Sequence, residues 1–142
     1  MVKQISIFLE NKCGRLVKVT QTLGEHGINI RALTIADTSD FGIMRLIVDQ
    51  PEKAHQVLRD AGFMATETEV VAVEVPDTPG GLADVLEYLE QNSINIEYLY
   101  SFVEKPAQDA LILMRLENIE KAKQVLAENN INLLEGERLY SL

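Results

Sequence analysis

An internal duplication is the feature that most constrains how this chain of 142 residues folds. The stretch "NKCGRLVKVTQTLGEHGINI", which begins at Asn11, aligns without a gap with "DTPGGLADVLEYLEQNSINI", which begins at Asp77. Further on, "PEKAHQVL" from Pro51 aligns with "IEKAKQVL" from Ile119. The offset grows from 66 residues in the first pair to 68 in the second, so the second copy carries about two extra residues. We place them in the segment 101–109.

The hydrophobic period switches in the same order in each copy. Residues 3–10 and 69–75 alternate between apolar and polar side chains and contain many β-branched residues, which predicts strands. The segments that follow carry apolar residues at i, i+3, i+4 and i+7, which indicates amphipathic helices. Each "INI" begins a strand, and a hairpin leads to the next one. Second helices are predicted over residues 51–61 and 119–129, and a final strand closes each copy.

The resulting order is βαββαβ, repeated. It predicts an α+β fold of two ferredoxin-like units, each an antiparallel sheet with both helices on one face, because right-handed crossovers largely fix the topology. The predicted domains are residues 1–69 and 70–142, with no Gly/Ser/Pro linker between them.

A glycine-containing loop precedes the first helix of each copy. In "DTPGGL", Pro79 suits the first helical position, and Asp77 or Thr78 can cap the free N–H groups that follow. Gly80 and Gly81 each lower helix propensity by roughly 1 kcal/mol relative to alanine. The pair therefore predicts that a binding partner approaches the backbone of the first turn closely, with the glycines as a docking surface.

Composition disfavours several classes of function. The net charge of −9 disfavours nucleic-acid binding, which requires a basic protein surface. No apolar run approaches the ~20 residues of a membrane span, and the alternating start does not resemble a signal peptide, so we expect a cytoplasmic protein. The single cysteine, Cys13, belongs to no pattern with metal-ligand spacing, so we expect no metal and no cofactor.

Enzymatic activity is also not expected. No catalytic triad or paired acid and base is apparent in the sequence, and His26 and His55 have no evident carboxylate partner. An RNA-recognition module needs several aromatic residues on its central strands, where only Phe8 is present.

The two loops and their spacing to "INI" resemble the ACT domain, a small regulatory module that binds amino acids. The resemblance covers the whole chain as a tandem pair. It implies that an effector binds at the interface between two such domains, where the loop before the first helix of one copy faces the second strand of the other. The first copy departs from the pattern, since Cys13 and Arg15 stand where the second copy has Pro79 and Gly81.

The chemistry of the loop residues is consistent with an amino-acid ligand. A helix start offers free N–H groups and a positive dipole end to an α-carboxylate. Asn11 or Asp77 can accept from the α-ammonium group, and Asn29 and Asn95 offer both a donor and an acceptor. The predicted ligand-binding residues are Asn11, Cys13, Gly14, Arg15, Leu16, Asn29, Ile30, Asp77, Pro79, Gly80, Gly81, Leu82, Asn95 and Ile96.

Each of these residues also has a purely structural interpretation. The loops can be ordinary capped turns, the asparagines can hold the preceding turn through their side chains, and Cys13 can be a small apolar filler. We expect a non-catalytic sensor that binds a free amino acid, forms a homodimer and regulates a metabolic enzyme. The alternative is a structural adaptor or a detached enzyme subunit that acts only through protein association.

Overall fold

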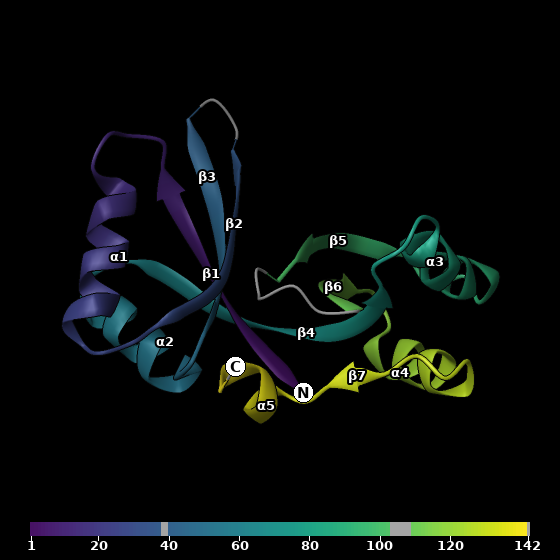
Figure 1. The fold of residues 1–142 in the computed structure, drawn as a ribbon. Coiled ribbons are helices and arrows are strands. Elements are labelled where there is room, and N and C mark those ends of the chain that lie inside the picture. Colours follow the sequence, from purple (N-terminus) through teal and green to yellow (C-terminus); the bar gives the residue numbers. More distant parts are fainter. Residues whose placement is uncertain (38–39, 103–108, 142) are drawn as a thin grey trace. The chain divides into compact units, whose positions relative to one another are not determined.

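The computed structural model describes residues 1–37, 40–102 and 109–141 (Figure 1). The elements of the first half are β1 (Val2–Glu10), α1 (Arg15–Glu25), β2 (Ile30–Asp37), β3 (Phe41–Val48), α2 (Pro51–Asp60) and β4 (Met64–Pro76). Those of the second half are α3 (Gly81–Gln91), β5 (Ile96–Ser101), β6 (Asp109–Leu116), α4 (Ile119–Glu128), β7 (Leu133–Leu134) and α5 (Gly136–Tyr140).

Strand β4 serves both copies of the repeat. The strand that closes the first copy and the strand that opens the second form one continuous element of 13 residues. We expected two separate strands here, and the structure joins them because no turn residue interrupts "MATETEVVAVEVP".

By contact the chain divides into two compact units. One contains Lys3–Thr68 and the end of the chain from Tyr140, and we call it the N-terminal unit. The other contains Met1–Val2 and Glu69–Leu139, and we call it the C-terminal unit. The predicted boundary after residue 69 stays a prediction.

The strand order is the same in both units. In the N-terminal unit it is β2-β3-β1-β4, with β3 antiparallel to both β1 and β2. In the C-terminal unit β4 lies between β7 and β6, and β5 is at the edge beside β6, with antiparallel pairing throughout. Each order places the last strand of the copy beside the first one, as the ferredoxin-like arrangement requires.

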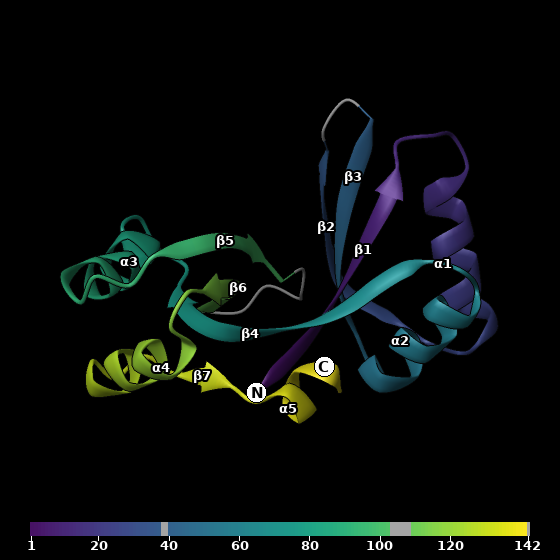
Figure 2. The same ribbon diagram turned by 180° about the vertical axis from the view of Figure 1, so that it is seen from behind.

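Helices α1 and α2 of the N-terminal unit pack on one face of its strands, and α3 and α4 do the same in the C-terminal unit (Figure 1), as the view from behind also shows (Figure 2). In the N-terminal unit, Ile5, Ile7 and Leu9 of β1 form a core with Val19 and Leu23 of α1. In the C-terminal unit, the alternate residues Val71, Val73 and Val75 of β4 pack with Val85 and Leu89 of α3. The alternation of β1 and the helical spacing of α1 and α3 thus produce the predicted cores.

The start of α3 differs from the prediction. The helix begins at Gly81 and its N-cap is Gly80, so Pro79 is not at the first helical position, and no side chain provides the cap. Gly80 has φ of +83°, and this left-handed conformation itself favours glycine. Gly81 is buried, and a Cβ atom there would collide with the carbonyl oxygen of Pro76. The local backbone structure therefore explains why glycine occupies both positions.

The end of the chain also departs from expectation. The closing strand of the second copy, β7, has only two residues, and the short helix α5 was not predicted. The insertion that we placed in segment 101–109 falls mainly on residues 103–108, which lie outside the described part of the chain.

Candidate functional site

The loop between β1 and α1 of the N-terminal unit is held by its backbone. The N–H of Asn11 donates to the carbonyl of Asp40 over 2.9 Å, and the N–H of Lys12 donates to the carbonyl of Glu10 over 2.9 Å. Gly14 is the N-cap of α1 with φ of +90°, and no side chain caps the helix. The N–H of Arg15 donates to the carbonyl of Lys12 over 3.3 Å, so the available first-turn N–H groups are those that follow Arg15, which an α-helix cannot pair internally.

A cavity of about 330 Å³ opens at this loop. Its lining consists of Leu9, Glu10, Asn11, Lys12, Cys13, Gly14, Arg15, Leu16, Val17, Ile35 and Gly42. The structure therefore brings together all five loop residues that the sequence singled out in the first copy. Cys13 is exposed here, so its interpretation as a packed filler was wrong.

Three charged side chains of the lining form one cluster. Glu10 contacts the ammonium of Lys12 at 2.8 Å and the guanidinium of Arg15 at 3.5 Å. The hydrogen bond from Lys12 and its positive charge, followed by the charge of Arg15, lower the pKa of Glu10 below its ordinary value. Glu10 thus stays ionised at neutral pH beside two cations.

The corresponding loop of the C-terminal unit has a different first turn. Asp77, Pro79 and Gly80 are exposed, whereas Gly81 is buried against the end of β4. Leu82 is half-buried and packs against the hydrophobic core of its unit. The first helical residues of this loop therefore pack against their own unit, whereas those of the first loop line a cavity.

A second cavity, of about 580 Å³, lies beside the end of α3 and the start of β5. It is lined by Ala83, Leu86, Glu87, Glu90, Ile94, Asn95 and Ile96. Asn95 and Ile96 therefore line a hollow of their own unit, which the loop of Asp77 to Leu82 does not share.

The two asparagines occupy equivalent turns. The carbonyl of Asn29 accepts from the N–H of Asp49 over 3.1 Å, and that of Asn95 accepts from the N–H of Glu117 over 3.2 Å. The N–H of Asn29 donates to the Asp49 carboxylate over 2.9 Å, whereas the Asn95 side chain donates to the Glu117 carboxylate over 3.2 Å. Both asparagines are exposed. The predicted pairing of each asparagine with the loop of the other copy stays a prediction.

Ile30 and Ile96, the last residues of the two "INI" motifs, pack against the cores of their units. Within the N-terminal unit, Asn29 and Ile30 lie beyond the C-terminal end of α1, while the loop cavity lies at the N-terminal end. One helix of 11 residues, about 16 Å long, separates them.

Several lining residues were missed by the sequence analysis. Leu9 and Glu10 end β1, and Val17 follows Leu16 on the helix, so proximity to the loop was a usable signal for them. Ile35 and Gly42 come from β2 and β3, and only the folded hairpin brings them to the loop.

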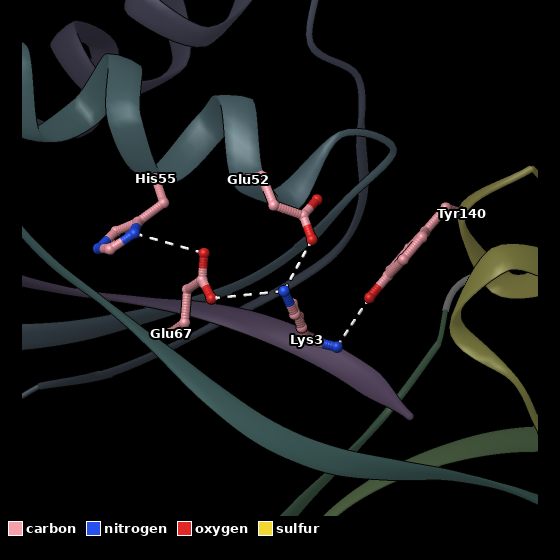
Figure 3. A network of polar contacts seen from close by, with 5 residues as sticks. All are labelled: Lys3, Glu52, His55, Glu67 and Tyr140. Carbon is pink, nitrogen blue, oxygen red and sulfur yellow. Dashed lines mark hydrogen bonds and ion pairs between the residues drawn. The ribbon is translucent and has the colours of Figure 1, made fainter.

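A polar network occupies the other end of β1 (Figure 3). The ammonium of Lys3 lies 2.7 Å from the carboxylate of Glu52 and 3.8 Å from that of Glu67, which is 3.3 Å from the His55 ring. The hydroxyl of Tyr140 accepts from the backbone N–H of Lys3 over 2.7 Å. The hydrogen bond with Glu52 raises the pKa of Lys3, and burial raises that of Tyr140. We assign this network a structural role, since it fastens the end of the chain to β1.

Other kinds of site find no support in residues 1–37, 40–102 and 109–141. No group of three or more His, Cys, Asp or Glu side chains in these segments could hold a metal ion. Across the same segments, no helix has the length and apolar character needed to cross a membrane.

Comparisons with known proteins identify the family and the fold. A family model described as "ACT domain pair" matches residues 1–142. The crystal structure of protein BT0572 from Bacteroides thetaiotaomicron is 45% identical, with a TM-score of 0.93 over 99% of this chain and 96% of that chain. No curated protein matches the sequence.

Two more distant structures share the fold. The regulatory subunit of aspartate kinase from Thermus thermophilus, in its ligand-free form, is 18% identical, with a TM-score of 0.65 over 89% of this chain and 91% of that chain. The regulatory subunit of aspartate kinase from Thermus flavus is 18% identical, with a TM-score of 0.63 over 88% of each chain. The predicted α+β fold of two ferredoxin-like units is confirmed.

Proposed function

Because the chain belongs to the family of ACT domain pairs, we propose that it is a non-catalytic sensor that binds a free amino acid and reports its level to a partner. The observation that carries this proposal is the cavity of about 330 Å³ at the start of α1. Its volume lies at the lower end of the ~300–1,000 Å³ that small-molecule sites occupy.

The polar part of the cavity suits the head group of an amino acid. The first-turn N–H groups of α1 that follow Arg15, together with the Arg15 guanidinium, are donors for an α-carboxylate. The ionised carboxylate of Glu10 is an acceptor for an α-ammonium group. Donors and acceptors of both kinds thus meet in one hollow, as a zwitterionic ligand requires.

The proposed partner of the sensor is supported by similarity to regulatory subunits and not by the geometry of the site. The two Thermus structures are regulatory subunits of aspartate kinase, and the proposal extends a regulatory role of this kind to the present chain. A regulated metabolic enzyme as partner, assembly as a homodimer and a cytoplasmic location are parts of the same proposal. So is completion of the ligand site by a second ACT domain.

A thermal-shift screen of the twenty amino acids against the full chain tests the proposal. A ligand that binds the folded state stabilises it by about 2.7 kcal/mol at a hundredfold excess over Kd. For a chain of this size the melting temperature should rise by about 5–10 °C. An unchanged melting temperature with every amino acid would contradict the sensor function.

A second function, that of an adaptor acting through protein association, is favoured by one observation. Phe8 and Phe41 stack with ring centroids 4.9 Å apart, yet they are 46% and 41% exposed. With Met64, which is 69% exposed, they line a groove of about 200 Å³. Exposed apolar groups that gather in this way are typical of protein contacts. Concentration-dependent association together with a flat thermal-shift screen would support this alternative.

A further inference from the structure

The lining of the cavity at the start of α1 is mostly apolar, and its apolar side chains come from three elements. Leu9 belongs to β1, Leu16 and Val17 to α1, and Ile35 to β2. Leu16 is 43% exposed, Val17 is 54% exposed and Ile35 is 42% exposed. Such exposure of large apolar side chains around one hollow favours a ligand that covers them with apolar surface of its own.

The charged side chains of the lining are already engaged with one another. Glu10 pairs with both Lys12 and Arg15, at 2.8 Å and 3.5 Å. The cluster carries one anion and two cations, so its net positive charge complements the α-carboxylate of a ligand. No further charge in the lining is left to pair with a charged ligand side chain.

We propose that the effector of this cavity is an amino acid with an apolar side chain. This inference rests on the proposed function and names the class of its ligand. The head group binds at the Glu10 cluster and the start of α1, and the side chain contacts Leu16, Val17 and Ile35. A charged or amide side chain placed against these residues loses its hydration without gaining a partner, which disfavours binding.

Pairs of amino acids with nearly the same shape test the inference by isothermal titration calorimetry on the full chain. Valine and threonine form one pair, and leucine and asparagine form the other. An apolar pocket rejects an isostere that adds a hydroxyl by about 100-fold. We therefore expect valine to bind about 100-fold more tightly than threonine, and leucine to bind more tightly than asparagine by at least as much.

A matched pair of variants tests whether the preference for apolar amino acids arises from the wall of the cavity. Ile35→Thr removes apolar surface from the lining and keeps a β-branched residue in β2, so the affinity for the best apolar amino acid should fall about tenfold. Leu33→Thr is the control. Leu33 is 47% exposed and lies on the same face of β2 as Ile35, because the two are two residues apart in the strand, but it does not line the cavity. Its affinity should stay within about twofold of the unmodified chain.

The outcomes separate the inference from the function on which it rests. Tighter binding of threonine than valine, or of asparagine than leucine, overturns the apolar class and leaves the sensor function standing. An equal loss of affinity in both β2 variants, or no loss in Ile35→Thr, also overturns the inference, because the apolar wall then does not select the ligand. Absence of binding for all amino acids overturns both the inference and the sensor function.

Discussion

The two copies of the repeat begin their first helices in the same way and differ at the next residue. Gly14 and Gly80 are both N-caps with left-handed backbone, with φ of +90° and +83°. The first helical residue is Arg15 in one copy and Gly81 in the other. Arg15 is half-buried and contacts Glu10, whereas Gly81 is buried under the carbonyl of Pro76.

This difference shows which part of the loop carries information about ligands. The left-handed N-cap favours glycine in both copies, so the glycine at this position does not by itself indicate a ligand. The residue after it decides whether the helix start packs against its own strand or extends a charged side chain into a cavity. In this comparison the first copy is the better candidate for effector binding.

Separating the two copies of the repeat should reduce stability more than any of the substitutions below. Residues 1–69 expressed alone would lose the part of β4 beyond residue 69 and the contacts of the chain end from Tyr140. We expect this fragment to be unfolded or self-associated, because it lacks the chain end from Tyr140, which belongs to the same compact unit as Lys3–Thr68. Circular dichroism and size-exclusion chromatography of the fragment are the measurements. A folded, stable monomer would show that the copies are independent.

Alanine at the first helical residue should affect the two copies very differently. Gly81→Ala places a Cβ against the carbonyl of Pro76, so we expect a loss of about 1–3 kcal/mol in the free energy of unfolding. Arg15→Ala removes a surface ion pair worth at most about 1 kcal/mol, and it should weaken ligand binding instead. Urea denaturation measures both variants. Equal losses of stability would remove the distinction between the loops.

Alanine at the N-cap should affect the two copies alike. Gly14→Ala and Gly80→Ala each force a side chain into left-handed backbone, at a cost of about 1–2 kcal/mol. Because a Cβ meets nothing within 4 Å at either position, no steric clash is added. Denaturation curves of the two variants should therefore nearly coincide. A marked difference between the two curves would mean that the left-handed N-cap does not contribute equally to stability in the two copies.

The smallest effect concerns the polar network at the start of β1, which belongs to the N-terminal unit. Burial raises the pKa of Tyr140 above its ordinary value of 10. The folded state therefore holds this proton more tightly than the unfolded chain, and stability falls as the pH rises above 10. Tyr140→Phe should lower stability by about 0.5–1 kcal/mol at neutral pH through the lost hydrogen bond.

Above pH 10 the Tyr140→Phe variant should lose stability less steeply than the unmodified chain. Part of the loss should persist, since the pKa of Lys3 is also raised by its hydrogen bond with Glu52. Thermal melts between pH 8 and pH 11 measure the slopes. Identical slopes for variant and unmodified chain would show that Tyr140 does not titrate in this way.

The sequence was sufficient for the repeat, the βαββαβ order within each copy and the loop of the first copy, because these depend on local periodicity and on aligned positions. It was not sufficient for the shared strand β4, which required knowing that no turn forms near residue 69. Nor could it give Ile35 and Gly42 as cavity residues, since only hairpin packing brings them to Leu16. The double glycine does not by itself indicate a ligand, because the left-handed N-cap at Gly80 and the close backbone contact at Gly81 already favour glycine.

A crystal structure of the full chain with the amino acid that raises the melting temperature most would test the central claim directly. We predict that this amino acid occupies the cavity at the start of α1. Its α-carboxylate should lie about 2.7–3.2 Å from first-turn N–H groups or Arg15, with its side chain against Leu16 and Ile35. An amino acid bound instead in the hollow of Glu87, Glu90 and Asn95, with the first cavity empty, would contradict this account.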